Sequence, residues 1–488
     1  MYSVVKNFFL DKRNQFIFAV TFAWGLLAHG MMLFRTLAIH DAAGDMISTG
    51  GYWEISLGRY MWTLMAMIDR KIMGSTNLAL PEFYGLGALF LLALSLCLLA
   101  LLFHIDNKAI LTAICGFAAT SSAVLMVLGY MFMVLYYCIA LFSVTAGSYI
   151  ICSNRRSAIN IFAGIVLIFL AMSVYQGFFA MALSIILLHL INKTEKENLS
   201  WPDFWRTGFY LLGCGIAALL LYIAGYKSAL LAASFRQHDI KATDYASFST
   251  LGVTSILGYM KRIIKAYHFS LVMPRVNSQI FINRTVHIYY VILAVSIYLA
   301  LRELVYLFKV SKRSAWQFLF LCSIFPLCVN LMQVIVERHT AHALTSTSWI
   351  VFIIFILQRA DAVPSLPNRK YFRNTVIVLL MLSNLIMARH DNACYVKLEL
   401  CQSQAISYFT TLITRIKSTE GYKDKLPVAY INEFNKKDES LYTPNEFYSI
   451  TPILPYSFAD KNIINNYAWK AFMRLWCGYN PKLFDGLG

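Results

Sequence analysis

Long apolar runs, separated by short polar segments, fill most of this 488-residue chain. The hydrocarbon core of a bilayer requires about 20 apolar residues per crossing helix. Eleven segments approach that length: 16–36, 83–104, 109–128, 133–152, 158–174, 178–192, 207–226, 286–308, 316–337, 346–358 and 374–388. The tenth is short, and the polar run Thr345–Ser348 leaves its start open. The pattern predicts an all-α polytopic membrane protein with about 11 transmembrane helices.

Basic residues collect on one side of these predicted helices. With the N-terminus in the cytoplasm, the cytoplasmic segments include Lys12, Arg13, Lys108, Arg155, Arg156, Lys193, Lys196, Arg206, Lys309, Lys312, Arg313, Arg359, Arg369, Lys370 and Arg373. The opposite turns at 129–132 and 175–177 contain no Lys or Arg. Because short cytoplasmic loops are enriched in Lys and Arg, we expect residues 37–82, 227–285 and 338–345, and the tail from 389, to be extracytoplasmic.

The chain divides into a predicted membrane module, residues 1–389, and a tail, residues 390–488, with the composition of a soluble region. Within the tail, Cys394–Ser418 has a helical pattern and Leu426–Ile431 (LPVAYI) has the pattern of a buried strand. We therefore expect a small extracytoplasmic α/β C-terminal domain. In the outer loop 227–285, Leu257–Leu271 alternates apolar and basic residues at helical spacing, as in a helix that lies flat on a membrane.

Composition agrees with the membrane class and excludes several others. Hydrophobic residues make up 59% of the chain and charged residues 14%, whereas a soluble domain has about 25% charged residues. The formal net charge is +17, which basic cytoplasmic loops explain without a nucleic-acid partner. The ten cysteines form no CxxC pair and no Cys/His zinc spacing, so no metal site is predicted.

The polar segment after the first apolar run, residues 36–60, carries the densest candidate chemistry. Its charged residues include Asp41, Asp45, Glu54 and Arg59. If the segment is helical, Asp41 and Asp45 share a face and can act as base and metal ligand, or as base and orienting partner. The alternative is an ordinary solvated turn. Arg59 stands beside aromatic residues, which suits either a phosphate clamp or a contact with lipid headgroups.

The ninth apolar segment carries a polar stripe. Asn330, Gln333 and Glu337 are spaced to share one helical face, and this face leads outward to Arg338 and His339. Such stripes usually line a cavity in a membrane protein, and the alternative is hydrogen bonding between helices.

Two smaller motifs also face the predicted outer side. Tyr175 and Gln176 could hydrogen-bond a sugar or belong to an aromatic interface belt. Lys261, Arg262 and Lys265 could hold a lipid-linked phosphate or attach to anionic headgroups. The chain has no Walker motif, no GxGxxG before a helix and no catalytic-serine elbow. If the protein is a transferase, its activated donor must therefore reach the outer face already attached to lipid.

Taken in order, these motifs resemble the serotype-converting glucosyltransferases that modify bacterial O-antigens, a family of the GT-C class of polytopic glycosyltransferases. The resemblance covers nearly the whole chain. It rests on IHDAAGD (Ile39–Asp45), GRY (Gly58–Tyr60), YQ (Tyr175 and Gln176), Arg338 with His339, and a tail that opens HDNACYVKLELCQSQAISYF and continues KLPVAYI. One departure is visible: adjacent acids of the form Asn-Asp-Asp are expected, whereas Ala42 follows Asp41 here and the second acid is Asp45.

The resemblance implies a GT-C-like fold and transfer of a glycosyl group, with glucosyl expected, from a polyprenyl phosphate to a polysaccharide such as O-antigen. The reaction would occur on the outer face of the bacterial cytoplasmic (inner) membrane. The catalytic candidates are Asp41 as base, with Asp45 as partner or alternate. The candidates for binding the donor phosphate are Arg59, Lys261, Arg262, Lys265 and Arg338. The candidates for binding substrate are His40, Glu54, Tyr175, Gln176, Glu337 and His339.

A transporter or flippase for lipid-linked sugars is the alternative function, because it would use the same polar cavity without a catalytic acid. The transfer chemistry allows a divalent cation and does not require one, and no other cofactor is expected. The expected partners are the lipid-linked sugar, the polysaccharide acceptor and the bilayer. The sequence does not identify the sugar, the linkage or the acceptor polymer.

Overall fold

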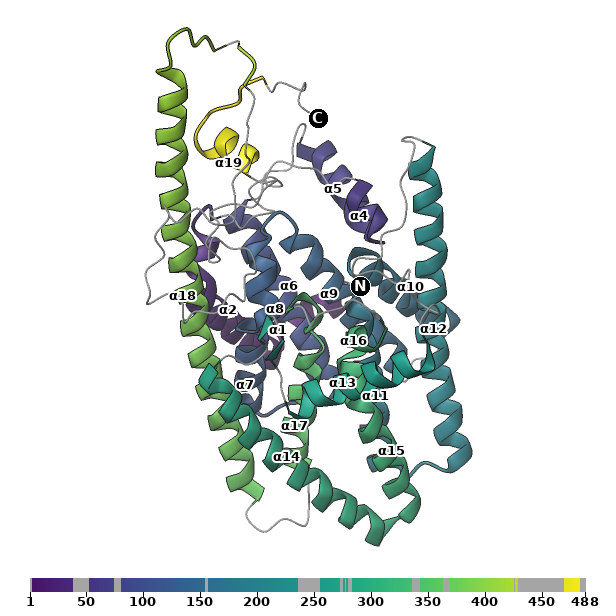
Figure 1. Cartoon of the computed structure of the whole chain (residues 1–488). Helices are drawn as coiled ribbons and strands as arrows, with labels where there is room; N and C mark the ends of the chain where they lie inside the picture. Colours follow the sequence, from purple (N-terminus) through teal and green to yellow (C-terminus); the bar gives the residue numbers. More distant parts are fainter. Residues whose placement is uncertain are drawn as a thin grey trace.

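The computed structural model of the chain is a bundle of helices (Figure 1). It describes residues 2–37, 52–73, 80–153, 157–235, 255–272, 275–276, 278–279, 283–335, 343–362, 369–424, 426–428 and 469–482. Across these residues the predicted helical architecture is confirmed, apart from one short pair of strands. The strands among them are β1 (Arg275–Val276) and β2 (Ser278–Gln279), which form one short antiparallel pair.

The helices follow the predicted order along the chain. The first half contains α1 (Tyr2–Leu10), α2 (Lys12–Leu33), α4 (Tyr52–Ser56), α5 (Tyr60–Met73), α6 (Pro81–Leu102), α7 (Lys108–Ala119), α8 (Ser122–Gly129), α9 (Val134–Cys152), α10 (Ala158–Val174), α11 (Phe178–Glu197) and α12 (Trp201–Ser234). The second half contains α13 (Ile256–Leu271), α14 (Asn283–Val310), α15 (Lys312–Val329), α16 (Leu331–Ile335), the 3₁₀ turn η2 (Ala343–Thr345), α17 (Trp349–Ala362), α18 (Arg369–Lys417) and α19 (Trp469–Trp476).

Within the described residues, eight stretches of helix are long and apolar enough to cross a bilayer. They are α2, α6, the α7–α8 pair, α9, α11, α12, α14 and α18. The other three predicted crossings are also helical, as α10, α15 and α17, but they are shorter or less apolar.

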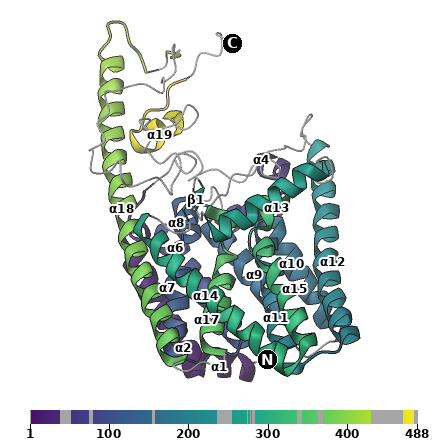
Figure 2. The same cartoon turned by 60° about the horizontal axis from the view of Figure 1, so that its bottom comes forward.

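Successive helices run between the same two ends of the bundle. At one end, the start of α2 meets the α6–α7 turn through Arg13 Nη1 and Asp106 Oδ1 (2.9 Å), and Gln358 Nε2 near the end of α17 donates to Phe103 O (3.1 Å). We call this the Arg359 end. Figure 2 shows α1 there, with α4 and α13 at the opposite end, which we call the α4 end.

Helix α18 is a single rod of 49 residues. At 1.5 Å per residue it is about 70 Å long, roughly twice the thickness of a hydrocarbon core. Its first part packs on α2 and α7, and its last turns extend beyond the bundle, where α19 lies against them (Figures 1 and 2). The rings of Phe409 and Phe472, 5.8 Å apart, form part of that contact. Residue 390 lies inside α18, so the helix continues without a break from the bundle into the tail.

The predicted α/β character of the tail is not shown, because its described residues form the second half of α18 together with α19. Of the predicted strand Leu426–Ile431, Val428 donates its N–H to Lys482 O (2.8 Å), and residues 429–431 lie outside the described part. Cys394 and Cys401 both lie in α18, and all ten cysteines, each within the described residues, are free thiols.

Candidate active site

The described part of the chain contains seven of the predicted site residues. They are Glu54, Arg59, Tyr175, Gln176, Lys261, Arg262 and Lys265. The other predicted site residues lie outside the described residues; they are His40, Asp41, Asp45, Glu337, Arg338 and His339. The structure brings Arg59, Tyr175 and Gln176 together at the α4 end, and it places the basic residues of α13 in a separate group.

The turn between α4 and α5, residues 57–60, requires glycine at position 58. Gly58 has φ +80°, a left-handed conformation that side chains with a Cβ rarely adopt. A Cβ added there would stand 2.2 Å from Tyr222 Oη and 2.8 Å from Gln176 Nε2. Because Gly58 has no side chain, the backbone can lie directly against the polar groups of Tyr222 and Gln176. We call residues 57–60 the GRY turn.

Three consecutive carbonyl groups at this turn each accept a hydrogen bond from a side chain of the bundle. The pairs are Tyr226 Oη to Ser56 O (2.7 Å), Gln176 Nε2 to Leu57 O, and Tyr222 Oη to Gly58 O (3.2 Å). We call these three bonds the carbonyl grip. Because buried carbonyls need partners, the grip allows an irregular turn to be buried against α12 and the start of α11.

Gln176 is the centre of the grip and is 1% exposed. Besides its bond to Leu57 O, its Nε2 donates to Tyr222 Oη (2.9 Å). A side-chain amide has two N–H donors, so both are engaged within the protein. If Gln176 contacts substrate as predicted, only its carbonyl oxygen remains for that purpose.

Helix α5, which follows the turn, is held by hydrogen bonds at two places along its length. Ser173 Oγ donates to Tyr60 Oη (2.7 Å), and further along α5 Asp69 accepts bonds from Tyr84 Oη and Tyr136 Oη, both at 2.7 Å. Burial raises the pKa of Tyr60 to about 12, so its hydroxyl stays protonated at neutral pH. These bonds fix the position of α5 and therefore of the GRY turn that precedes it.

Arg59 is positioned by an aromatic ring. Its guanidinium carbon lies 4.9 Å from the centroid of Tyr175, which is within the range of a cation–π contact. Tyr175 is in turn packed against Tyr137, with ring centroids 5.6 Å apart. Within the described part of the chain, no carboxylate pairs with Arg59, and its buried Nε has no hydrogen-bond partner. The arrangement therefore holds the guanidinium in place while leaving its charge available to an anion.

Two interruptions between helices lie next to Tyr175, whose ring contacts Arg59. Tyr175–Gly177 separates α10 from α11, and η2 precedes α17. The two interruptions touch, because a Cβ on Gly177 would lie 3.4 Å from Thr345 Cα and Tyr137 Oη donates to Leu344 O. Two connections between helices therefore meet beside the ring on which the Arg59 guanidinium lies.

The predicted basic cluster on α13 divides in two. Arg262 is 8% exposed, and its Nη1 donates to Ile335 O (2.9 Å) and Val334 O (3.3 Å) at the end of α16. Lys261 and Lys265 are exposed, and helical spacing places them on one flank of α13, beside its buried face. The structure therefore places Arg262 in a helix-capping position and leaves the two lysines at the surface.

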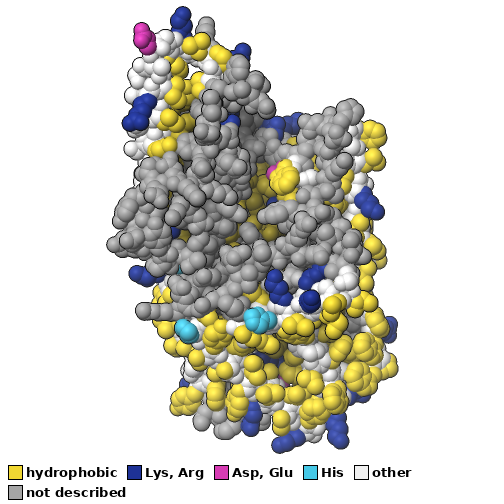
Figure 3. All heavy atoms as spheres, in the orientation of Figure 1, with side chains coloured by type: hydrophobic (Ala, Val, Ile, Leu, Met, Phe, Trp, Pro, Cys, Tyr) yellow, Lys and Arg dark blue, Asp and Glu magenta, His cyan; other side chains and the backbone are white. Residues whose placement is uncertain are grey.

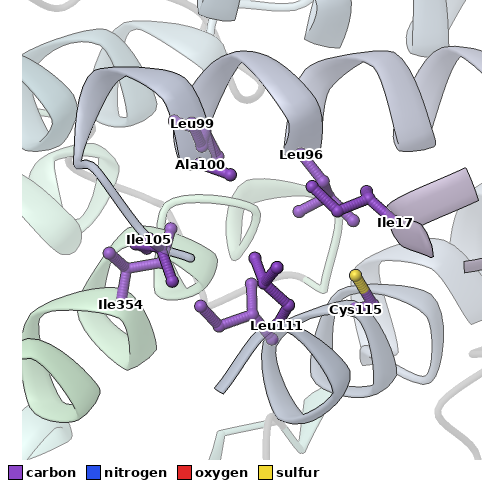
Figure 4. A pocket seen from close by; sticks show the side chains of 9 residues that line it. Ile17, Leu96, Leu99, Ala100, Ile105, Leu111, Cys115 and Ile354 are labelled. Carbon is purple, nitrogen blue, oxygen red and sulfur yellow. The ribbon is translucent and has the colours of Figure 1, made fainter. Parts of the chain in front are cut away.

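Metal-ligand groups and internal voids are the other features that could hold a ligand. Among the described residues no group of three His, Cys, Asp or Glu side chains is arranged to hold a metal ion. A small void between α2, α6, α7 and α17 is lined by apolar side chains such as Ile17, Leu96, Leu111 and Ile354 (Figure 4). It offers no hydrogen-bonding group to a sugar, so we interpret it as a packing defect.

Three residues that build this site were not predicted from the sequence. Tyr222 and Tyr226 lie one turn apart on α12 and supply two bonds of the grip. Asp69 anchors α5. The available signals were two tyrosines at a spacing of four within an apolar run, and one acid within MIDRKI.

Comparison with known proteins gives one family. The family model described as Glucosyl transferase GtrII matches residues 30–356. The match includes α4, the GRY turn, Tyr175, Gln176 and α13, and it ends within α17. No curated protein and no solved structure matches the chain.

Proposed function

The chain belongs to the GtrII glucosyltransferase family, and from this premise we propose that it moves a glucosyl group from a polyprenyl phosphate to a hydroxyl group of a bacterial surface polysaccharide such as O-antigen. Family membership is the observation that carries the proposal. The multi-span bundle supplies a suitable frame, because at one end it holds an arginine that pairs with no carboxylate of the described residues. We also assign the protein to the GT-C class.

The proposed reaction breaks the bond between the anomeric carbon and the donor phosphate oxygen and forms a bond from that carbon to the acceptor oxygen. The acceptor hydroxyl must lose its proton, and we assign this step to Asp41, with Asp45 as partner or alternate base. The leaving phosphate gains negative charge as the bond breaks. A fixed cation is then more useful in the transition state than in the ground state.

Arg59 is the described residue best suited to that phosphate. Guanidinium groups bind phosphate through paired N–H donors. Arg59 lies on the ring of Tyr175, and among the described residues no carboxylate neutralises its charge before a phosphate binds. Arg338, carried over from the sequence, is the proposed second cation. The carbonyl grip keeps Arg59 at one position, which favours catalysis because little reorganisation is needed when charge develops.

We propose that the α4 end faces away from the cytoplasm. The turns at the Arg359 end carry Lys12, Arg13, Lys108, Lys193 and Lys312, and short basic turns are typical of the cytoplasmic side. A donor attached to a lipid would then enter the bundle from the membrane, with its sugar at the level of the helix breaks. The proposed location is the inner membrane of a bacterium.

Mass analysis of surface polysaccharide from cells with and without the gene tests this function. We expect one added hexose per repeat unit when the gene is present, and no addition in an Asp41→Asn, Asp45→Asn double variant that reaches the membrane at normal levels. Purified protein should convert polyprenyl-phosphate glucose to product in the presence of acceptor. A double variant that still adds the hexose contradicts the catalytic assignment and favours a flippase.

A further inference from the structure

Helix α13 has two faces of different chemistry. Its buried face contains Arg262, Ala266, Phe269 and Ser270. The opposite face exposes large apolar side chains, and two exposed lysines lie at its edge. Because the apolar side chains on the outer face are not covered by the protein, the partner of that face must accept both apolar and cationic groups.

The inner face is attached to three other helices. Arg262 donates to the last carbonyls of α16. Asn330 Nδ2, between α15 and α16, donates to Ser270 Oγ (2.5 Å), and Tyr289 Oη of α14 donates to Ser270 O. Tyr267 Oη also donates to Ser323 O on α15. These bonds fix the rotation of α13 about its own axis, so the composition of its outer face is set by the fold.

The outer face carries a strip of large apolar side chains, and two lysines lie along one edge of this strip. Ile256 is 82% exposed, Leu257 61%, Met260 54% and Ile264 64%. Lys261 and Lys265 are exposed beside them and lie one helical turn apart. Figure 3 shows basic side chains gathered in the middle of this face of the molecule, with a broad apolar surface below them. Exposed apolar patches of this kind are typical of membrane or protein contacts.

Position and charge together identify the partner. Helix α13 crosses the bundle obliquely at the α4 end, as Figure 2 shows, instead of standing parallel to the spans. A helix at that level meets acyl chains on one side and lipid headgroups on the other. Lysine stems can lie along apolar surface while the ammonium reaches a phosphate, and anionic headgroups attract basic residues near a membrane surface.

We propose that α13 is an interfacial helix whose Ile256, Met260 and Ile264 enter the acyl region of one leaflet while Lys261 and Lys265 bind the phosphates of anionic phospholipids. Arg262 has a different role, because it faces inward and holds the end of α16. The proposal does not depend on the transferase reaction. It separates a basic cluster that the sequence presents as a single group.

Fluorescence quenching in nanodiscs tests the position of the helix. Native cysteines are buried or partly buried, so a bimane label on Ile264→Cys of the full-length protein should react selectively, with unsubstituted protein as background. Lipids brominated on the acyl chain should quench this label strongly. A label on Ser418→Cys, exposed at the projecting end of α18, should not be quenched. Equal quenching at both positions, or none at Ile264→Cys, would overturn the proposal.

The choice of lipid tests the role of the lysines. In mixed nanodiscs, brominated phosphatidylglycerol in phosphatidylcholine should quench the label at position 264 more than brominated phosphatidylcholine in phosphatidylglycerol. Each lysine near a membrane surface contributes about a fivefold preference for anionic lipid, so the pair gives roughly 25-fold. Lys261→Gln, Lys265→Gln should remove the preference. The matched pair Lys309→Gln, Lys312→Gln, exposed at the Arg359 end, should leave it intact.

A donor assay separates phospholipid from the lipid-linked sugar. If Lys261 and Lys265 bound the donor phosphate, their double variant would raise the KM for polyprenyl-phosphate glucose in neutral phosphatidylcholine nanodiscs. The proposal expects no change of KM in that membrane. A several-fold increase there, together with an unchanged lipid preference at position 264, would overturn the proposal. The quenching readout needs no turnover, so it stands or fails separately from the proposed function.

Discussion

Two arginines in different environments, one buried and one partly buried, lie at opposite ends of α11. At its far end, Arg359 is 1% exposed, pairs with Glu195 and with Glu303 (2.7 Å), and donates to Asn192 Oδ1 (3.0 Å). About 25 Å away along α11, Arg59 lies on the ring of Tyr175, and neutral hydrogen bonds hold its backbone.

The comparison shows two uses of a guanidinium group. Two carboxylates compensate the charge of Arg359, which therefore locks α11, α14 and α17 together. Around Arg59, every strong bond is made by the neighbouring backbone, and the charge itself lacks a carboxylate within the described residues. A buried charge that carboxylates neutralise indicates a structural role. A charge that is held in position without a neutralising carboxylate indicates a binding role. The following predictions test that distinction.

The largest expected effect is the loss of stability in Arg359→Met. The substitution leaves Glu195 and Glu303 as buried carboxylates without their cation, which should cost about 3–5 kcal/mol. We expect a much lower thermal midpoint in detergent and little folded protein. Adding Glu195→Gln and Glu303→Gln should restore most of the midpoint. A single variant as stable as the parent would show that the cluster is not structural.

Arg59→Gln should instead reduce activity and leave the fold intact. Removing one preorganised group that stabilises developing charge typically lowers kcat by about 10²–10³-fold. Turnover of polyprenyl-phosphate glucose by purified protein is the measurement, with the thermal midpoint recorded on the same samples. Lys71→Gln, an exposed cation on α5, the helix that follows Arg59, is the control and should keep full turnover. If both variants lose turnover equally, Arg59 has no specific role.

Gly58→Ala should distort the GRY turn and displace Arg59. The left-handed backbone costs about 1–3 kcal/mol for a residue with a Cβ, and the new methyl would overlap Tyr222 Oη. We expect a lower turnover and a lower midpoint, partly recovered by adding Tyr222→Phe. Gly30→Ala, where an added Cβ meets nothing within 4 Å, is the matched control and should be neutral. Normal activity in Gly58→Ala would mean that the turn can move without consequence.

The smallest effect is expected from Tyr226→Phe. This variant removes one bond of the carbonyl grip, that to Ser56 O, at a cost of about 0.5–1.5 kcal/mol. The midpoint should fall slightly, and kcat should fall more than that loss of stability explains, because Arg59 depends on the turn. Tyr298→Phe, a half-exposed tyrosine, controls for the general effect of losing a hydroxyl. A change in midpoint alone would indicate that the grip stabilises without positioning.

Much of the fold was predictable because it follows from length and apolarity. A segment of about 20 apolar residues has few alternatives to a helix in a bilayer, and each predicted segment is helical in the structure. The tail was harder, since Cys394–Ser418 looks like an independent helix although it continues α18. Only the contacts of α18 with α2 and α7 reveal that the rod begins inside the bundle.

The candidate site was predictable in part. Arg59, Tyr175 and Gln176 were chosen as polar residues at the ends of apolar runs, and the structure brings them together. The structural role of Gln176 was not predictable, because both of its N–H donors bind groups of the protein, at Leu57 and Tyr222. Which carbonyl meets which donor depends on how α12 packs, and that is a long-range property.

The sequence by itself determined the membrane class, the order of the helices and the family, because these depend on local apolarity and on short motifs read along the chain. The tertiary structure decided the role of each charge. Lys261, Arg262 and Lys265 are near neighbours in sequence, yet packing against α16 turns Arg262 inward and leaves the lysines outside. The physical reason is that a charge acquires its function from the groups that compensate it, and those groups come from distant parts of the chain.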